Sequence, residues 1–161
     1  MKPRFDFAMV SPDAFEAMLG LGAYLADSEP YASLRHLVDL RASQINGCAY
    51  CIDMHWKDAR AHGESEQRLY ALDAWRDAPF YSERERAALA WTEAVTLVAD
   101  GHVPDDVYQA ARTQFGEREL VDLTLAVAAI NAWNRLCIAF RSQPNAQRPA
   151  AAHVHRVLEA A

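Results

Sequence analysis

The sequence predicts an all-α protein. Apolar residues recur every three or four positions along most of the chain, and sustained alternation of the strand type is scarce. Helix-starting and helix-stopping residues divide this pattern into segments of one to six turns. The chain has 161 residues, 52% of them hydrophobic and 24% charged, which is enough for one domain with a substantial core.

The helix boundaries follow from the capping residues. Ser11 and Pro12 suit an N-cap and a first turn, and Ser82 with Glu85 forms a capping box. Glycine at 47 and 63 stops the helices that precede it. About six to seven helices are expected, over roughly residues 13–26, 30–46, 48–62, 64–75, 82–100, 104–115 and 119–140.

The chain divides into a helical domain over residues 1–144 and a tail over 145–161. Pro144 and Pro149 separate the tail, which we expect to be a terminal helix or a mobile arm. A net charge of -6 without a basic stripe argues against nucleic acid or an anionic membrane as a partner. No apolar run approaches a membrane span and no signal peptide is evident, so we expect a cytoplasmic protein.

The stretch "INGCAYCIDMHWKDARAHG" contains the main candidate site. At 100° per residue, Cys48, Cys51 and His55 lie on one side of a helix that begins near Cys48. Cys51 and His55 are an i,i+4 pair within reach of a thiol–imidazole hydrogen bond. A helix N-terminus lowers the pKa of a nearby thiol, so the arrangement suits thiol–disulfide chemistry.

Two other interpretations of the cysteine pair remain open. A structural zinc site wants four ligands, and His62 is the fourth candidate after Cys48, Cys51 and His55. It lies seven residues beyond His55, at the far end of the helix. The pair could also be two inert buried thiols.

Several polar groups fall where burial is expected. Asn131 and Asn134 lie in the long apolar helix and need hydrogen-bond partners, from the structure alone or from a site. Trp133 and Cys137 in the same segment suit a core. Arg41 falls on an apolar stripe and requires a carboxylate that the sequence does not identify.

Four segments together resemble the alkylhydroperoxidase D (AhpD)-like, peroxidase-related branch of the carboxymuconolactone decarboxylase superfamily. They are "LRASQINGCAYCIDMH", "HGESEQRLYALDAW", "SERERAALAWTEAVTLV" and "LTLAVAAINAWNRLCIAFR". The resemblance extends from about Ser11 to Arg141. It implies an AhpD-like helical fold, assembly as homotrimers or hexamers, and hydroperoxide reduction at the CxxC.

The resemblance also implies residue roles. Cys51 matches the thiol that attacks the peroxide, Cys48 the thiol that resolves it into a disulfide, and His55 the histidine of the proton relay. The family's relay glutamate, twelve residues before the first cysteine, is replaced here by His36. A neutral His36 could still accept the thiol proton, and a protonated one would favour the thiolate. By helix position alone the first cysteine would be the attacker; the family pattern favours Cys51.

The leading hypothesis is therefore a thiol peroxidase without metal or other cofactor. Asn131, Trp133 and Asn134 are candidates for an apolar pocket that takes an organic hydroperoxide. The expected reductant is a dithiol on a lipoyl-bearing or thioredoxin-like protein. The alternatives are a non-catalytic redox sensor or binding protein on the same fold, and a decarboxylase of the superfamily that does not use the CxxC.

Overall fold

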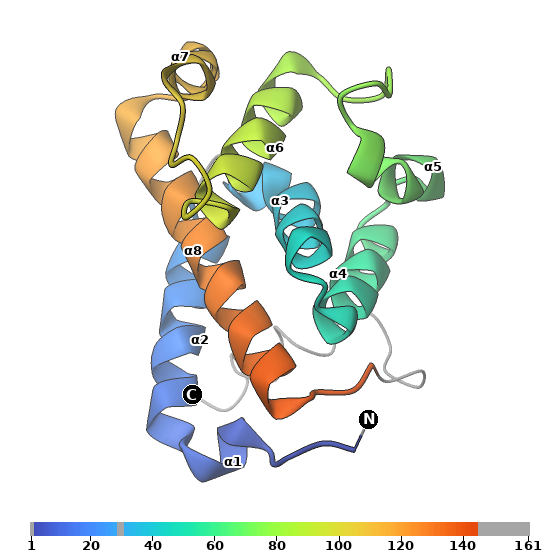
Figure 1. Ribbon diagram of the computed structural model, residues 1–161, viewed down its shortest axis with the longest axis vertical. Helices are drawn as coiled ribbons and strands as arrows, with labels where there is room; N and C mark the ends of the chain where they lie inside the picture. Colours follow the sequence, from blue (N-terminus) through green and yellow to red (C-terminus); the bar gives the residue numbers. More distant parts are fainter. Residues whose placement is uncertain (1, 29–30, 145–161) are drawn as a thin grey trace.

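The structure, a computed structural model, describes residues 2–28 and 31–144 (Figure 1). These residues form eight α-helices and one 3-10 helix, and no strand occurs among them, which confirms the all-α prediction. The elements are α1 (Phe7–Val10), α2 (Pro12–Ala26), α3 (Tyr31–Asn46), α4 (Ala49–Ala61), α5 (Glu66–Tyr70), η1 (Leu72–Ala74), α6 (Glu83–Thr96), α7 (Asp105–Gln114) and α8 (Glu117–Phe140).

Helices α3 and α8 are the centre of the molecule. α8 runs the length of the fold beside α2, and α3 packs against α8, α6 and α4 (Figure 1). α8 is long and apolar enough to cross a membrane, but its residues Leu123, Val127 and Ile130 are buried within the protein. Packing against other helices accounts for these buried residues, whereas Val121, Leu125 and Ile138 of the same helix are exposed.

The observed elements differ from the expected ones in three places. α1 was not predicted, and the helix expected to end near residue 100 ends at Thr96. The helix expected over 64–75 is two short elements, α5 and η1. The Tyr81 hydroxyl donates to the Arg68 carbonyl oxygen, which a continuing helix would have bonded to the amide four residues later. The predicted tail over 145–161 lies outside the described residues.

The turn between α3 and α4 places the cysteines. Gly47 has φ of +68°, a left-handed conformation that glycine adopts without steric cost. Its amide donates to the Gln44 carbonyl oxygen, and the Cys48 amide donates to that of Ser43. This glycine stop makes Cys48 the N-cap of α4.

Candidate active site

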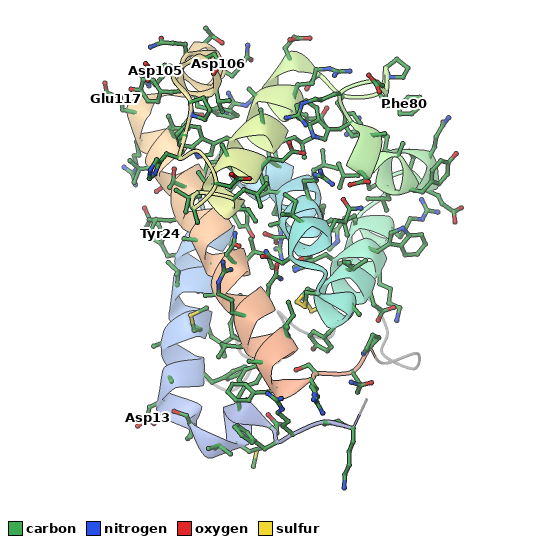
Figure 2. All side chains as sticks on the ribbon, viewed as in Figure 1. Asp13, Tyr24, Phe80, Asp105, Asp106 and Glu117 are labelled. Atoms are coloured by element: carbon green, nitrogen blue, oxygen red, sulfur yellow. A yellow bond between two sulfur atoms is a disulfide. The ribbon has the colours of Figure 1, made fainter. Side chains whose placement is uncertain are left out.

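The two cysteines of the CxxC form a buried disulfide at the start of α4 (Figure 2). Their Cα atoms are 5.3 Å apart, and each residue is 1% exposed. The Cys51 amide donates to Cys48 Sγ over 3.4 Å. The unpaired amides of a helix N-terminus favour negative charge, so after reduction this end of α4 stabilises a thiolate.

His55 lies one turn beyond Cys51 and faces a carboxylate of α3. Its Nδ1 is 3.7 Å from Asp39 Oδ2, longer than a hydrogen bond but close enough for strong electrostatic coupling. The Tyr31 hydroxyl is 3.0 Å from Oδ1 and 2.8 Å from Oδ2 of the same Asp39. All three residues are buried, so this is a polar chain inside the protein rather than on its surface.

Burial shifts both ionisable partners toward their uncharged forms. Burial raises the pKa of Asp39, although His55 and the Tyr31 hydrogen bond act to lower it. Burial lowers the pKa of His55, against the opposing effect of Asp39. Burial and the Asp39 carboxylate keep the pKa of Tyr31 well above its ordinary value, so its hydroxyl stays protonated and donates. Burial therefore shifts the pKa values of this pair in opposite directions, upward for Asp39 and downward for His55.

The second ring nitrogen of His55 is available for chemistry. Nε2 is buried and has no hydrogen-bond partner among the described residues. The negative potential of Asp39 favours the tautomer with hydrogen on Nδ1, which leaves a lone pair on Nε2. A buried imidazole with this open position can accept a proton from a thiol or return one to a leaving group.

His36 lies on α3, one turn before Asp39, and its ring lies against that of His62 with the two planes inclined at 36°. The two ring centroids are 4.7 Å apart. Burial, with smaller effects from Arg35 and His62, lowers the pKa of His36 to about 4. His36 is therefore neutral at physiological pH. The protonated form, which would favour a thiolate by its charge, is absent at that pH.

The two buried asparagines are held by a network that reaches the cysteine turn. Asn46, the last residue of α3, donates to Asn131 Oδ1 over 3.0 Å and to Asn134 Oδ1 over 2.9 Å. Asn134 donates to the Ser43 hydroxyl over 3.1 Å, and Asn131 to that of Thr96 over 3.0 Å. These bonds fix the end of α3 against α8, and they supply the partners that the sequence required.

Trp133 of α8 packs against aromatic residues from the N-terminal helices α1 and α2. Its ring lies 5.5 Å from that of Phe15 and 6.4 Å from that of Phe7. Phe7 also packs against the cysteines, so Trp133 is connected to them through an intervening ring.

Cys137, expected in the core, is beside the disulfide. The sulfur atoms of Cys48, Cys51 and Cys137 all lie within 4.8 Å of one another. His62 is elsewhere: it is the C-cap of α4, about 20 Å along the helix, where its Nδ1 lies 2.8 Å from the Asp58 carbonyl oxygen. The four-ligand set of Cys48, Cys51, His55 and His62 is not brought together.

The carboxylates that Arg41 needs are Glu93 of α6 and Asp73 of η1. Arg41 Nε donates to Glu93 Oε1 over 2.8 Å, and Arg41 also pairs with Asp73. Trp75 and Arg76 bind Glu93 as well. These contacts join α3, η1 and α6 and do not reach the cysteines, so the cluster is structural.

Comparison with known proteins identifies the family of this chain. Residues 12–94 match the carboxymuconolactone decarboxylase family. The uncharacterized protein YdfG of Bacillus subtilis is 42% identical over 139 residues, 86% of this chain and 95% of its own length. The chain therefore belongs to the carboxymuconolactone decarboxylase family.

Solved structures place it more narrowly within that family. A protein of unknown function from Agrobacterium tumefaciens, provisionally described as the antioxidant defence protein AhpD, superposes with a TM-score of 0.87. It is 44% identical and covers 91% of this chain and 100% of its own. The debrominase Bmp8 is 25% identical, with a TM-score of 0.73 over 84% of this chain and 73% of its own. The fold is AhpD-like, as the resemblance implied.

Sequence reasoning missed Asp39 and Tyr31. Both belong to α3, where the sequence pattern drew attention only to the apolar residues, His36 and Arg41. Nothing in the sequence indicated that Asp39 would face His55 of the next helix. One signal was present: Asp39 is three residues after position 36, so both positions share a helix face. The family's carboxylate position and Asp39 are therefore neighbours on one surface of α3.

Proposed function

We propose that this protein is a thiol-dependent peroxidase that reduces organic hydroperoxides through the Cys48–Cys51 pair. The observation that carries the proposal is the CxxC disulfide at the N-terminus of α4, with His55 one turn further along the same helix and paired with the buried Asp39. Family membership and the AhpD-like fold support it.

The proposed reaction begins with the reduced pair. The Cys51 thiolate attacks the distal peroxide oxygen, the O–O bond breaks, and the alkoxide leaves as an alcohol after taking a proton. Cys51 is then a sulfenic acid. The Cys48 thiol attacks its sulfur, water leaves, and the disulfide forms before further oxidation. Two thiols are oxidised for each peroxide reduced, and an external dithiol restores them by exchange.

His55 moves the protons in this scheme, and Asp39 positions it. Nε2 takes the Cys51 proton and delivers it to the leaving alkoxide. Asp39, held by Tyr31, stabilises the imidazolium that exists between these events. We infer that Asp39 takes over the role of the family's relay glutamate from one turn further along α3. His36 then assists only through its neutral ring.

The substrate and partners follow from the same resemblance. An organic hydroperoxide suits the apolar surroundings of the sulfurs, which include Phe7 and Tyr50. We propose that the hydroperoxide binds beside these apolar residues. The hydrogen-bond network of Asn131 and Asn134 would hold the binding region in place, and Trp133 would lie behind Phe7, on the side away from the sulfurs. A lipoyl-bearing or thioredoxin-like dithiol protein in the cytoplasm is the proposed reductant, and a homotrimer or hexamer is the proposed assembly.

Stopped-flow oxidation of the reduced protein tests the proposal. Cumene hydroperoxide should remove two thiols per chain, and Cys51→Ser should abolish the reaction. Cys48→Ser is the matched variant: it should still react, but stop at the sulfenic acid. Full thiol retention in wild type, with the thiols open to alkylation after unfolding, would exclude a peroxidase.

The debrominase Bmp8 on the same fold favours one second candidate. The thiol pair would then remove bromine from an aromatic ring, giving a C–H bond, bromide, a proton and the disulfide. Bromide release from a brominated pyrrole by the reduced protein, without reaction with hydroperoxide, would select this activity over the first.

A further inference from the structure

Cys137 gives the site a third sulfur that the proposed reaction does not use. It lies in the last turn of α8, far from the CxxC in sequence, yet the three sulfur atoms are within 4.8 Å of one another. All three residues are buried: Cys48 and Cys51 are 1% exposed and Cys137 is 5% exposed. After reduction, the same space holds three thiols.

Two properties determine which ion or small molecule three buried thiols can bind: its coordination number and the net charge of the complex. Zinc prefers four protein ligands in a closed site, and no further cysteine, histidine or acidic ligand joins this group among the described residues. Three thiolates around a monovalent or divalent cation would also leave net negative charge. Burying uncompensated charge is costly, and the partly buried hydrophobic residues packed against this cluster are Phe7 and Tyr50.

Trivalent arsenic meets both conditions. Arsenous acid is small and uncharged near neutral pH, and it forms three As–S bonds with soft sulfur ligands. Three thiols give up three protons, three As–O bonds break, and three water molecules leave. No electrons are transferred, and the product is a neutral, three-coordinate arsenic without need of a fourth ligand.

From this geometry we propose that reduced Cys48, Cys51 and Cys137 form a binding site for trivalent arsenic, taken up as arsenous acid. The disulfide form lacks two of the three ligands, so binding is confined to the reduced protein. Occupation removes both redox thiols, and arsenite is therefore an inhibitor of any chemistry at the CxxC. The site depends on the positions of the sulfurs and not on the peroxidase activity.

The composition of the arsenic adduct tests this site directly. The full chain is reduced with a phosphine, freed of reductant without oxygen, mixed with arsenite and weighed by native mass spectrometry. Wild type should gain one arsenic and lose three hydrogens. Cys137→Ser should lose only two hydrogens and keep one hydroxyl on arsenic, with about tenfold or greater loss of affinity. Ser142, whose amide donates to the Cys137 carbonyl oxygen, is a neighbour but not a ligand, so Ser142→Ala should behave as wild type.

Three outcomes would overturn the site. They are a wild-type adduct that retains a hydroxyl, no adduct in the reduced protein, and equal affinity in wild type and Cys137→Ser. If Cys137→Ser does not fold, the mass of the wild-type adduct still decides between two and three As–S bonds. No peroxide is used, so failure here and failure of the proposed peroxidase are separate results.

Discussion

Asp39 Oδ2 lies 3.7 Å from His55 Nδ1, and both side chains are almost fully enclosed by protein. This contact joins α3 to α4 one helical turn after Cys51. It provides a carboxylate one turn after position 36, where this chain has a histidine in place of the family's glutamate.

We expect Asp39→Asn to slow oxidation of the thiols by cumene hydroperoxide about 100-fold, at the low end of what general acid–base catalysis contributes. The amide cannot stabilise the imidazolium of His55. Stopped-flow kinetics at pH 7 measures the rate. His36→Gln is the control and should react almost as fast as wild type. A His36→Gln variant as slow as Asp39→Asn would return the relay to His36.

Stability should fall with acid because of His36. Its pKa in the folded protein is about 4, below the ordinary value near 6.5 that it regains on unfolding. Between these values the unfolded chain binds more protons, so the free energy of unfolding decreases as pH falls from about 6.5 to about 4. Urea unfolding at pH 7 and pH 4.5 measures the difference. His36→Gln should lose less stability over this range; an identical loss would mean that His36 does not contribute.

We expect Asn134→Ala to reduce the free energy of unfolding by about 1–3 kcal/mol, since it leaves buried polar partners unpaired. Asn134 is completely buried and bonded to Asn46 and Ser43. Val121→Ala, at a position on α8 that is 58% exposed, is the control. Urea unfolding with an unchanged slope makes the comparison valid. Equal midpoints for the two variants would show that the network adds no stability.

Glu93→Gln should destabilise the protein by about 2 kcal/mol, less than for a fully buried pair because Asp73 still reaches Arg41. Burial acts to raise the pKa of Glu93, but hydrogen bonds from Trp75, Arg76 and Arg41 bring it below its usual value. Arg76→Ala removes a partner with a 61% exposed side chain and should cost less than about 1 kcal/mol. Thermal unfolding measures both; a larger loss in Arg76→Ala would contradict this order.

The sequence was informative where interactions are local and silent where they are distant. The glycine stop at Gly47 and the i,i+4 spacing of Cys51 and His55 are short-range patterns, and they predicted the helix that carries the CxxC. The Tyr81 bond that ends α5 joins residues thirteen positions apart along the chain, and no periodicity reveals it. Cys137 meets Cys48 and Cys51 only through the packing of α8. The same holds for Asp39, whose partner lies on the next helix.

The residues proposed for catalysis all belong to residues 31–55, one pair of helices joined at Gly47 and Cys48. The proposed relay, nucleophile and resolving thiol thus lie in one contiguous segment of the chain. Related proteins could differ in the remaining helices, and therefore in substrate or assembly, while keeping the arrangement of these residues. A fold that includes both a protein described as AhpD and a debrominase fits this kind of divergence.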